Sequence, residues 1–530
     1  MIKYIFTSCL ALSLTNPVFA SDILDLLGGK EAKVEIGKDK SLTLELRREI
    51  GSLNAEQVIL FNFLDQGQYE KAFYQWGSAF DGTKFAYEPT GRALKAYLFY
   101  KVGLQINALE MLTNIQNPGA IKKEMRNFWK EAAPLGTPSW QLADMNWDQV
   151  WTDVFGRQAE VQVKSRKIFD ANDYTQIESL LRKSSENTEE RAWLEWQLAL
   201  HFALNNDAAK GSKVLSLLMK ENKNFIDQNL MNITAARMLY ENGYLDAAIT
   251  YYQNVPKSSD YWFVAQEELA WSFIRKGEPQ NTLAVTKSLV QPGFKALIGP
   301  ETVFLRALSQ LKVCDYKGAS QSLLDYKSYF KPKAANLESL MANNTEPVEF
   351  FFKSLEKNGK LPLVKLKTKA YELPRYVTRD EVLFRLSQRA FGLKAEALKA
   401  AELYSKSLAG GTAKVGFQAD INDIKVGTDN KYQSAKNAFY NRIKLLATDE
   451  ITEINQILQK MHIVEAEILQ QVTVSQDIAA TDKNLFDVKK GSTGDKSKDV
   501  LKFPATDEIW FDEISNFKID VKKGCQISKK

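Results

Sequence analysis

Apolar residues recur at spacings of three and four along most of the chain, which is the pattern of α-helices with one buried face. Between residues 236 and 252 this pattern lies on both sides of Asn242-Gly243-Tyr244, so it predicts two helices joined by a glycine turn. Comparable turns recur at steps of 34 to 37 residues, apart from one step of 69 that corresponds to two repeats. The predicted turn residues are Gly67, Gly103, Asn172, Asn206, Gly243, Gly277 and Cys314.

This period resembles that of the tetratricopeptide-repeat (TPR) family, whose unit is a pair of antiparallel helices in about 34 residues. The residues that carry the resemblance are Tyr240, Gly243, Tyr244, Ala247 and Tyr251 in one unit and Ala270, Phe273, Gly277 and Ala284 in the next. The resemblance covers roughly residues 55–330. It implies an all-α, TPR-like solenoid of stacked helix hairpins, with a curved inner surface that holds a protein or peptide.

The regions around this repeat are less regular. Residues 21–54 form an N-terminal segment, and residues 331–428 are expected to continue the helix pairs irregularly, with an inserted loop or short extended segment at Leu361–Lys369. Residues 476–499 are polar and rich in Lys, Gly and Ser, and predict a flexible linker. Residues 500–530 predict a small β-like tail, because Phe517–Val521 alternates as a strand does.

Residues 429–475 carry a longer apolar stripe. Its members follow one another at steps of three and four and are Ile454, Ile457, Met461, Val464 and Ile468. Such a stripe is typical of a long helical hairpin or a short coiled coil. We expect an intramolecular hairpin here, with a dimer seam as the alternative.

The first 20 residues have the character of a cleavable export signal. Lys3 precedes a short apolar stretch, and Val18-Phe19-Ala20 resembles a cleavage site, so cleavage is predicted between Ala20 and Ser21. No other run of about 18 uncharged apolar residues follows, and a transmembrane segment is therefore not expected after cleavage. The predicted location is the periplasm or the exterior.

Composition sets the class of protein. Of the 530 residues, 45% are hydrophobic and 25% are charged, as in a folded globular chain. The net charge of +5 is small for this length, so nucleic acid is not an expected partner. After signal cleavage two cysteines remain, Cys314 and Cys525. An oxidising compartment allows them to pair, and two unpaired thiols or an intermolecular bond are the alternatives.

Residues with catalytic or cofactor-binding patterns are not evident. The two histidines, His201 and His462, are far apart, and no paired Cys-x-x-Cys motif, phosphate-binding glycine loop or nucleophile elbow occurs. The two carboxylates of a glycosidase would leave no spacing rule in a sequence, but residues 430–530 are largely committed to helix, linker and tail and leave no room for a separate lysozyme-like domain. We therefore expect no enzyme, no cofactor and no metal site.

A tryptophan-rich interruption supplies the candidate partner-binding residues. Trp140, Trp147 and Trp151 lie where prolines disturb the helical pattern, and Trp147 and Trp151 share one face if their segment is helical. They either fill a gap between helix pairs or present a stacking surface to a ligand. The favoured function is a non-enzymatic scaffold for protein–protein interaction in the cell envelope. The alternative is a carbohydrate-binding or peptidoglycan-binding helical-repeat protein.

Overall fold

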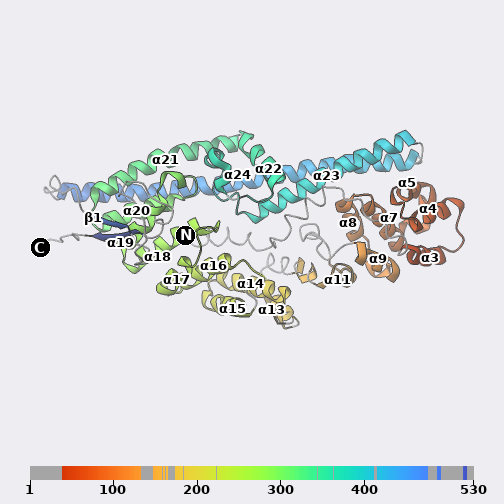
Figure 1. Ribbon diagram of the computed structural model, residues 1–530, viewed down its shortest axis with the longest axis horizontal. Coiled ribbons are helices and arrows are strands. Elements are labelled where there is room, and N and C mark those ends of the chain that lie inside the picture. The colour runs from red at the N-terminus through yellow and green to blue at the C-terminus, as the bar shows by residue number, and fades with distance from the viewer. Residues whose placement is uncertain are drawn as a thin grey trace, which may run out of the picture. The chain divides into compact units, whose positions relative to one another are not determined.

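The computed structural model describes residues 39–132, residues 147–474 apart from 158, 162, 165–173, 183, 185, 222–223, 343, 362 and 411–414, and two strands at 486–490 and 517–521 (Figure 1). Helices make up nearly all of this secondary structure, which confirms the all-α class. The chain divides into two compact units. Among the described residues, unit 1 holds 199–380, 441–474 and both strands, and unit 2 holds the remainder up to 198 together with 381–440.

Unit 2 begins at the first described helix. Its helices are α3 (Asp39–Ile50), α4 (Ala55–Asp65), α5 (Tyr69–Phe80), α6 (Lys84–Tyr87), α7 (Pro89–Lys101), α8 (Gln105–Thr113), α9 (Lys123–Ala132), α11 (Gln149–Phe155), α13 (Tyr174–Leu181), most of α14 (Glu189–Leu204) and α23 (Glu381–Gly410), followed by the first part of α24 (Val415–Val474). A short 3₁₀ helix, η2, covers Pro118–Ala120. The core is aromatic, and Phe417 of α24 packs its ring edge against Phe73 at 5.2 Å.

Unit 1 contains the longest run of consecutive helix contacts. Its helices are α15 (Ala208–Glu221), α16 (Gln228–Glu241), α17 (Leu245–Gln253), α18 (Trp262–Lys276), α19 (Pro279–Leu289), α20 (Pro300–Lys312), α21 (Tyr316–Ala342), α22 (Glu346–Asn358) and the rest of α24. Two 3₁₀ helices, η3 (Pro292–Phe294) and η4 (Leu363–Tyr371), lie between them. From α15 to α21 each helix packs against the next one in the chain. This order of contacts is that of helices folded back on one another pair by pair.

The predicted turn residues have the backbone that such reversals require. Six of them have a positive φ: Gly67, Gly103, Asn206, Gly243, Gly277 and Cys314. The seventh, Asn172, lies outside the described residues. The N–H of each of the six donates a hydrogen bond to the carbonyl three residues earlier, as Gly243 N does to Tyr240 O. The N–H of the next residue donates to the carbonyl five residues before it, as Tyr244 N does to Leu239 O. This pair of hydrogen bonds is the Schellman motif that ends helices. The turn prediction is therefore confirmed at these six positions.

Three expectations about the C-terminal third are wrong. The hairpin expected within residues 429–475 is absent, because α24 is one continuous 60-residue helix. No Gly or Pro interrupts residues 428–474, so nothing in that stretch breaks the helix. The loop or extended segment expected at Leu361–Lys369 contains the 3₁₀ helix η4. The expected flexible linker at 476–499 is wrong only at strand β1 (Phe486–Lys490), and its other residues lie outside the described residues.

The strand expected at Phe517–Val521 is present as β2, which pairs antiparallel with β1 in a register that sets Phe486 opposite Val521. Strand β2 packs against α19. Phe517 is buried there, and the ammonium of Lys287 lies 5.4 Å from the centre of its ring. The pair of strands therefore belongs to the packing of unit 1.

The turn geometry predicts opposite outcomes for two glycines of unit 1. Gly243 has φ +81°, and a Cβ built there would meet no described atom within 4 Å. Gly243→Ala should therefore destabilise unit 1 by about 1–2 kcal/mol through backbone strain alone. Gly293 has equally open surroundings without a positive φ, so Gly293→Ala should have little effect or stabilise slightly. Denaturant unfolding checks both variants, and an equal loss in the two would contradict the turn argument.

Candidate functional site

The tryptophans selected from the sequence lie mainly in the core of unit 2. Trp151 on α11 is 1% exposed and packs beside Phe155. Trp147 is partly buried against the same core, and its indole N–H donates to Thr152 Oγ1 at 3.0 Å. Trp140 lies outside the described residues. The packing accounts for Trp147 and Trp151 as core side chains, and the partner-binding role of the three stays a prediction.

Cys314 ends α20 with φ +63° and is disulfide-bonded. The hydroxyl of Tyr316 lies 3.4 Å from its Sγ. The two other cysteines of the chain, Cys9 and Cys525, are outside the described residues. The pairing of Cys314 with Cys525 therefore stays a prediction.

The apolar stripe of α24 is buried inside unit 1. Ile454, Ile457, Met461, Val464 and Ile468 are each at most 8% exposed and belong to one core with residues of α16 to α21. Tyr326 of α21 donates its hydroxyl to Ile454 O at 2.6 Å, so the contact also includes the helix backbone. The stripe seals unit 1 within a single chain, and it is therefore not free to serve as the dimer seam considered from the sequence.

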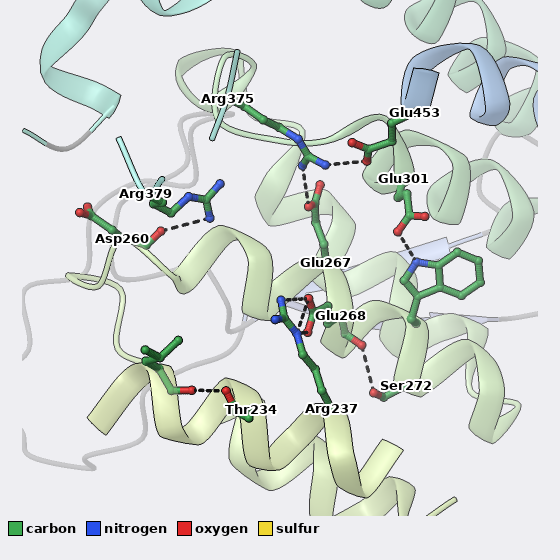
Figure 2. Close-up of polar contacts among 12 residues, drawn as sticks. Thr234, Arg237, Asp260, Glu267, Glu268, Ser272, Glu301, Arg375, Arg379 and Glu453 are labelled. Carbon is green, nitrogen blue, oxygen red and sulfur yellow. Dashed lines mark hydrogen bonds and ion pairs between the residues drawn. The ribbon is translucent and has the colours of Figure 1, made fainter. Parts of the chain in front are cut away.

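A buried ionic cluster surrounds Arg375, which follows η4 (Figure 2). Its guanidinium donates to Glu267 of α18 at 3.0 Å and to Glu453 of α24 at 2.5 Å, and the side chain is 3% exposed. Its backbone N–H donates to Glu450 Oε2 at 2.8 Å. One residue thus links two helices that are nearly 200 positions apart in the sequence.

Glu267 also holds the start of α20. Its carboxylate accepts the N–H of Gly299 and the hydroxyl of Thr302, the latter at 2.6 Å. An anion at this position satisfies donors that a helix N-terminus leaves unpaired. Gly299 is required for close approach, because a Cβ there would come 2.0 Å from Arg375 Nη1.

Lys333 closes the other side of the cluster. This lysine of α21 is buried and donates to the carbonyls of Ala370 and Leu373, and Glu450 lies 3.8 Å away. Burial lowers the pKa of Lys333, although the nearby Glu450 carboxylate opposes the change. These contacts fix the chain just after η4.

The acidic members of the cluster are perturbed by burial. Burial raises the pKa of Glu453 to about 7, even though Arg375 favours its charged form. Burial also raises the pKa of Glu301, whose carboxylate accepts a hydrogen bond from the indole of Trp271 at 2.7 Å. Two further glutamates, Glu267 and Glu453, lie near enough to disfavour its negative charge. Negative charge is therefore costly at this place.

Unit 2 has a related arrangement. The buried Glu396 of α23 accepts the N–H groups of Ile106 and Asn107 and the side-chain amide of Asn107, all at the start of α8. Burial raises the pKa of Glu396 to about 7, and these donors act in the opposite direction. In each unit a buried glutamate from another helix thus binds the N-terminus of a helix, α20 in unit 1 and α8 in unit 2.

The solvent side of α24 differs from an ordinary exposed helix face. Seven residues between 451 and 466 are exposed, and none is Lys, Arg, Asp or Glu: Thr452, Asn455, Gln456, Gln459, His462, Ile463 and Ala466. We call these seven residues the outer face. Ile463 retains 70% of its exposure. The charged residues of the same turns, Glu453, Lys460 and Glu465, are only partly exposed and flank this face.

The sequence analysis missed both the ionic cluster and the outer face. The glutamates and Arg375 carry no motif, and the segments that meet at Arg375 are separated by more than 70 residues on either side. The outer face left a visible signal, because four turns without an exposed charge are unusual in a chain with 25% charged residues.

Comparison with known proteins identifies no relative. No protein-family model matches the chain, and no curated protein sequence matches it significantly. Within the described residues, no helix is long and apolar enough to cross a membrane.

Removing the Arg375 guanidinium from the buried ionic cluster should strongly lower the free energy of unfolding. Arg375→Met leaves Glu267 and Glu453 buried without their partner, and breaking such a pair costs about 3–5 kcal/mol. The matched control is Lys276→Met, which removes a cation with two carboxylate partners, Asp246 and Glu278, at the surface. That variant should unfold near the wild-type denaturant midpoint. Equal midpoints for the two variants would contradict the structural role of Arg375.

The disulfide can be assigned directly. Non-reducing peptide mapping of the protein isolated from its native compartment should give one peptide that joins Cys314 to Cys525. Under reducing conditions Cys314→Gly should be more stable than Cys314→Ser, since only glycine adopts the φ of +63° without strain. Free thiols at both positions would eliminate the predicted pairing.

Proposed function

We propose that this protein is a non-enzymatic, exported, TPR-like scaffold that binds a protein partner in the cell envelope. The proposal for export relies on the signal-like residues 1–20, which lie outside the described residues. The TPR-like solenoid is supported by the six Schellman turns, which are 34 to 37 residues apart except for one step of 103, and by the consecutive contacts from α15 to α21. Repeats of this kind expose long surfaces that suit protein recognition.

The observation that carries the binding function is the outer face of α24. A solvated helix face usually bears charges, and charged residues are depleted at the centres of protein interfaces. The outer face combines exposed Ile463 and Ala466 with amide and hydroxyl side chains, and partly exposed charges flank it. Because its opposite side is fixed in the core of unit 1, the helix presents this face without an ordering cost. It suits a partner helix that lies along α24.

The glycan-binding alternative has less support. It depended on tryptophans that stack on sugar rings, and Trp151 is buried in the core of unit 2. Among the described residues, Trp147 keeps only part of its ring accessible. We therefore favour a protein partner.

The outer face predicts a specific loss of binding. Gln459→Arg combined with Ile463→Arg introduces two charges on it, which a partner helix would have to desolvate. We expect the partner that photo-crosslinks to a probe at Asn455 in wild-type cells to be lost. Stability should change by no more than about 0.5 kcal/mol, since both positions are exposed.

The matched control is Leu217→Arg, which alters an exposed apolar residue of α15 in the same unit. It should leave crosslinking unchanged. If the double variant still gives the wild-type crosslinks, α24 is not the docking surface.

A further inference from the structure

The exposed side of α24 continues beyond the outer face in both directions. From residue 445 to residue 469, about 36 Å of helix, exposed residues follow one another at alternating steps of three and four. We call these eight residues the ladder: Leu445, Thr448, Thr452, Asn455, Gln459, His462, Ala466 and Leu469. The leucines at its two ends keep 56% and 61% of their exposure. Residues with this spacing form the seam along which two helices pack in a coiled coil.

We propose that the partner helix is α24 of a second copy of this chain, packed antiparallel along the ladder. The inference rests on the proposed function, because it names the molecule that covers the outer face. The ladder lies on the side of α24 opposite the buried stripe from Ile454 to Ile468, so unit 1 stays closed when the two copies meet.

The ladder is complementary to its own reverse. When the two-fold axis lies level with Ile457, each residue of the ladder faces another that suits it. The pairs are Leu445 with Leu469, Thr448 with Ala466, Thr452 with His462, and Asn455 with Gln459. The leucines cover each other, and the polar side chains at the centre offer one another donors and acceptors. A shift of one heptad would set Leu445 against His462, so the match selects one register.

Helix α21 flanks the ladder on one side (Figure 1). The Lys327 ammonium lies 3.3 Å from the Glu465 carboxylate, and the Thr448 hydroxyl lies 3.6 Å from Met341 Sδ. These contacts show that α21 runs antiparallel to α24. Midway between them, residue 334 of α21 lies level with the proposed two-fold axis.

Charges on α21 agree with this axis. Because Glu338 follows residue 334 by four positions, the two-fold rotation brings Glu338 of the second copy level with residue 330, between Lys327 and Lys331. Glu338 and Lys331 are exposed. Opposite charges at the edge of an interface guide the partners into one orientation. A parallel copy fits less well, because it would set His462 against His462 and place α21 of the two copies on opposite edges of the seam.

Asp449 is the exposed charged residue within the span of the ladder, among the described residues of α24. It lies beside the ladder on the side away from α21, and nearby Arg442 favours its charged form. A charge at the rim of an interface keeps its contact with water, so Asp449 does not oppose the packing.

Disulfide trapping in the full-length protein tests the pairing. Leu445→Cys combined with Leu469→Cys should give a disulfide-linked dimer under mild oxidation, because each new thiol faces the other one in the second copy. Either single variant should give no more dimer than the wild type, since the two-fold axis places identical positions about 36 Å apart. A linked dimer in the single variants, or none in the double variant, would overturn the proposal.

Light scattering of the same protein measures the assembly without a crosslink. The wild type should have twice the mass of one chain. Gln459→Arg combined with Ile463→Arg should reduce this to the mass of one chain, and the control Leu217→Arg should leave it unchanged. A wild type with the mass of one chain at every concentration would contradict the second copy as partner.

Crosslinking in cells separates this inference from the proposed function. With two differently tagged copies expressed together, the photo-crosslinking probe at Asn455 should join one tag to the other. If the probe joins this chain only to a different protein, the second copy is wrong and the docking function of the outer face remains. If Gln459→Arg with Ile463→Arg keeps the wild-type crosslinks, the docking function itself is wrong.

Discussion

The rest of the structure depends on one backbone constraint, the left-handed residue that ends a helix and turns the chain back. At six positions this residue donates to the turn before it, and the following residue reaches one position further back, so the last carbonyls of each helix are satisfied locally. The next helix then leaves in a direction that packs it on its predecessor. Four of the six positions carry glycine, while Asn206 and Cys314 adopt the same φ at a cost that the surrounding helix packing offsets.

Two kinds of contact hold the long helix α24 in unit 1, the burial of its apolar stripe and the buried ion pairs of Arg375. Its stripe from Ile454 to Ile468 removes five large side chains from water, and such contacts are strong but do not select one register over another. Arg375 adds that selection, because its bonds to Glu267 and Glu453 are made in only one position of the helix. Burying these charges is expensive, so the cluster specifies the arrangement more than it stabilises it.

How far the sequence predicts this protein depends on the range of the interaction. The turns at Gly243 and Gly277 were predictable because a left-handed conformation favours glycine, which the sequence shows directly. The strand at Phe517–Val521 was predictable from its alternating apolar and polar residues. The apolar stripe of α24 was visible too, but the surface that covers it was not, since spacings of three and four are the same whether the helix packs in a hairpin, on a second copy or on other helices of its own chain. The ionic cluster could not be predicted from the sequence, because its members come together only when α18, α20 and α24 pack against one another.

The two sides of α24 are unfavourably solvated in opposite ways, with charged groups buried on one side and an apolar side chain exposed on the other. On the inner side, carboxylates that would prefer water are held beside Arg375, and on the outer side Ile463 is held in water although it would prefer an apolar contact. Buried carboxylates can be relieved within the chain, by a proton or by hydrogen bonds. Exposed Ile463 cannot be relieved by moving inward, because the buried stripe fixes the rotation of the helix. A helix locked in this way can lower its free energy on the outer side only by contact with another molecule, which is the physical reason to look for the partner there.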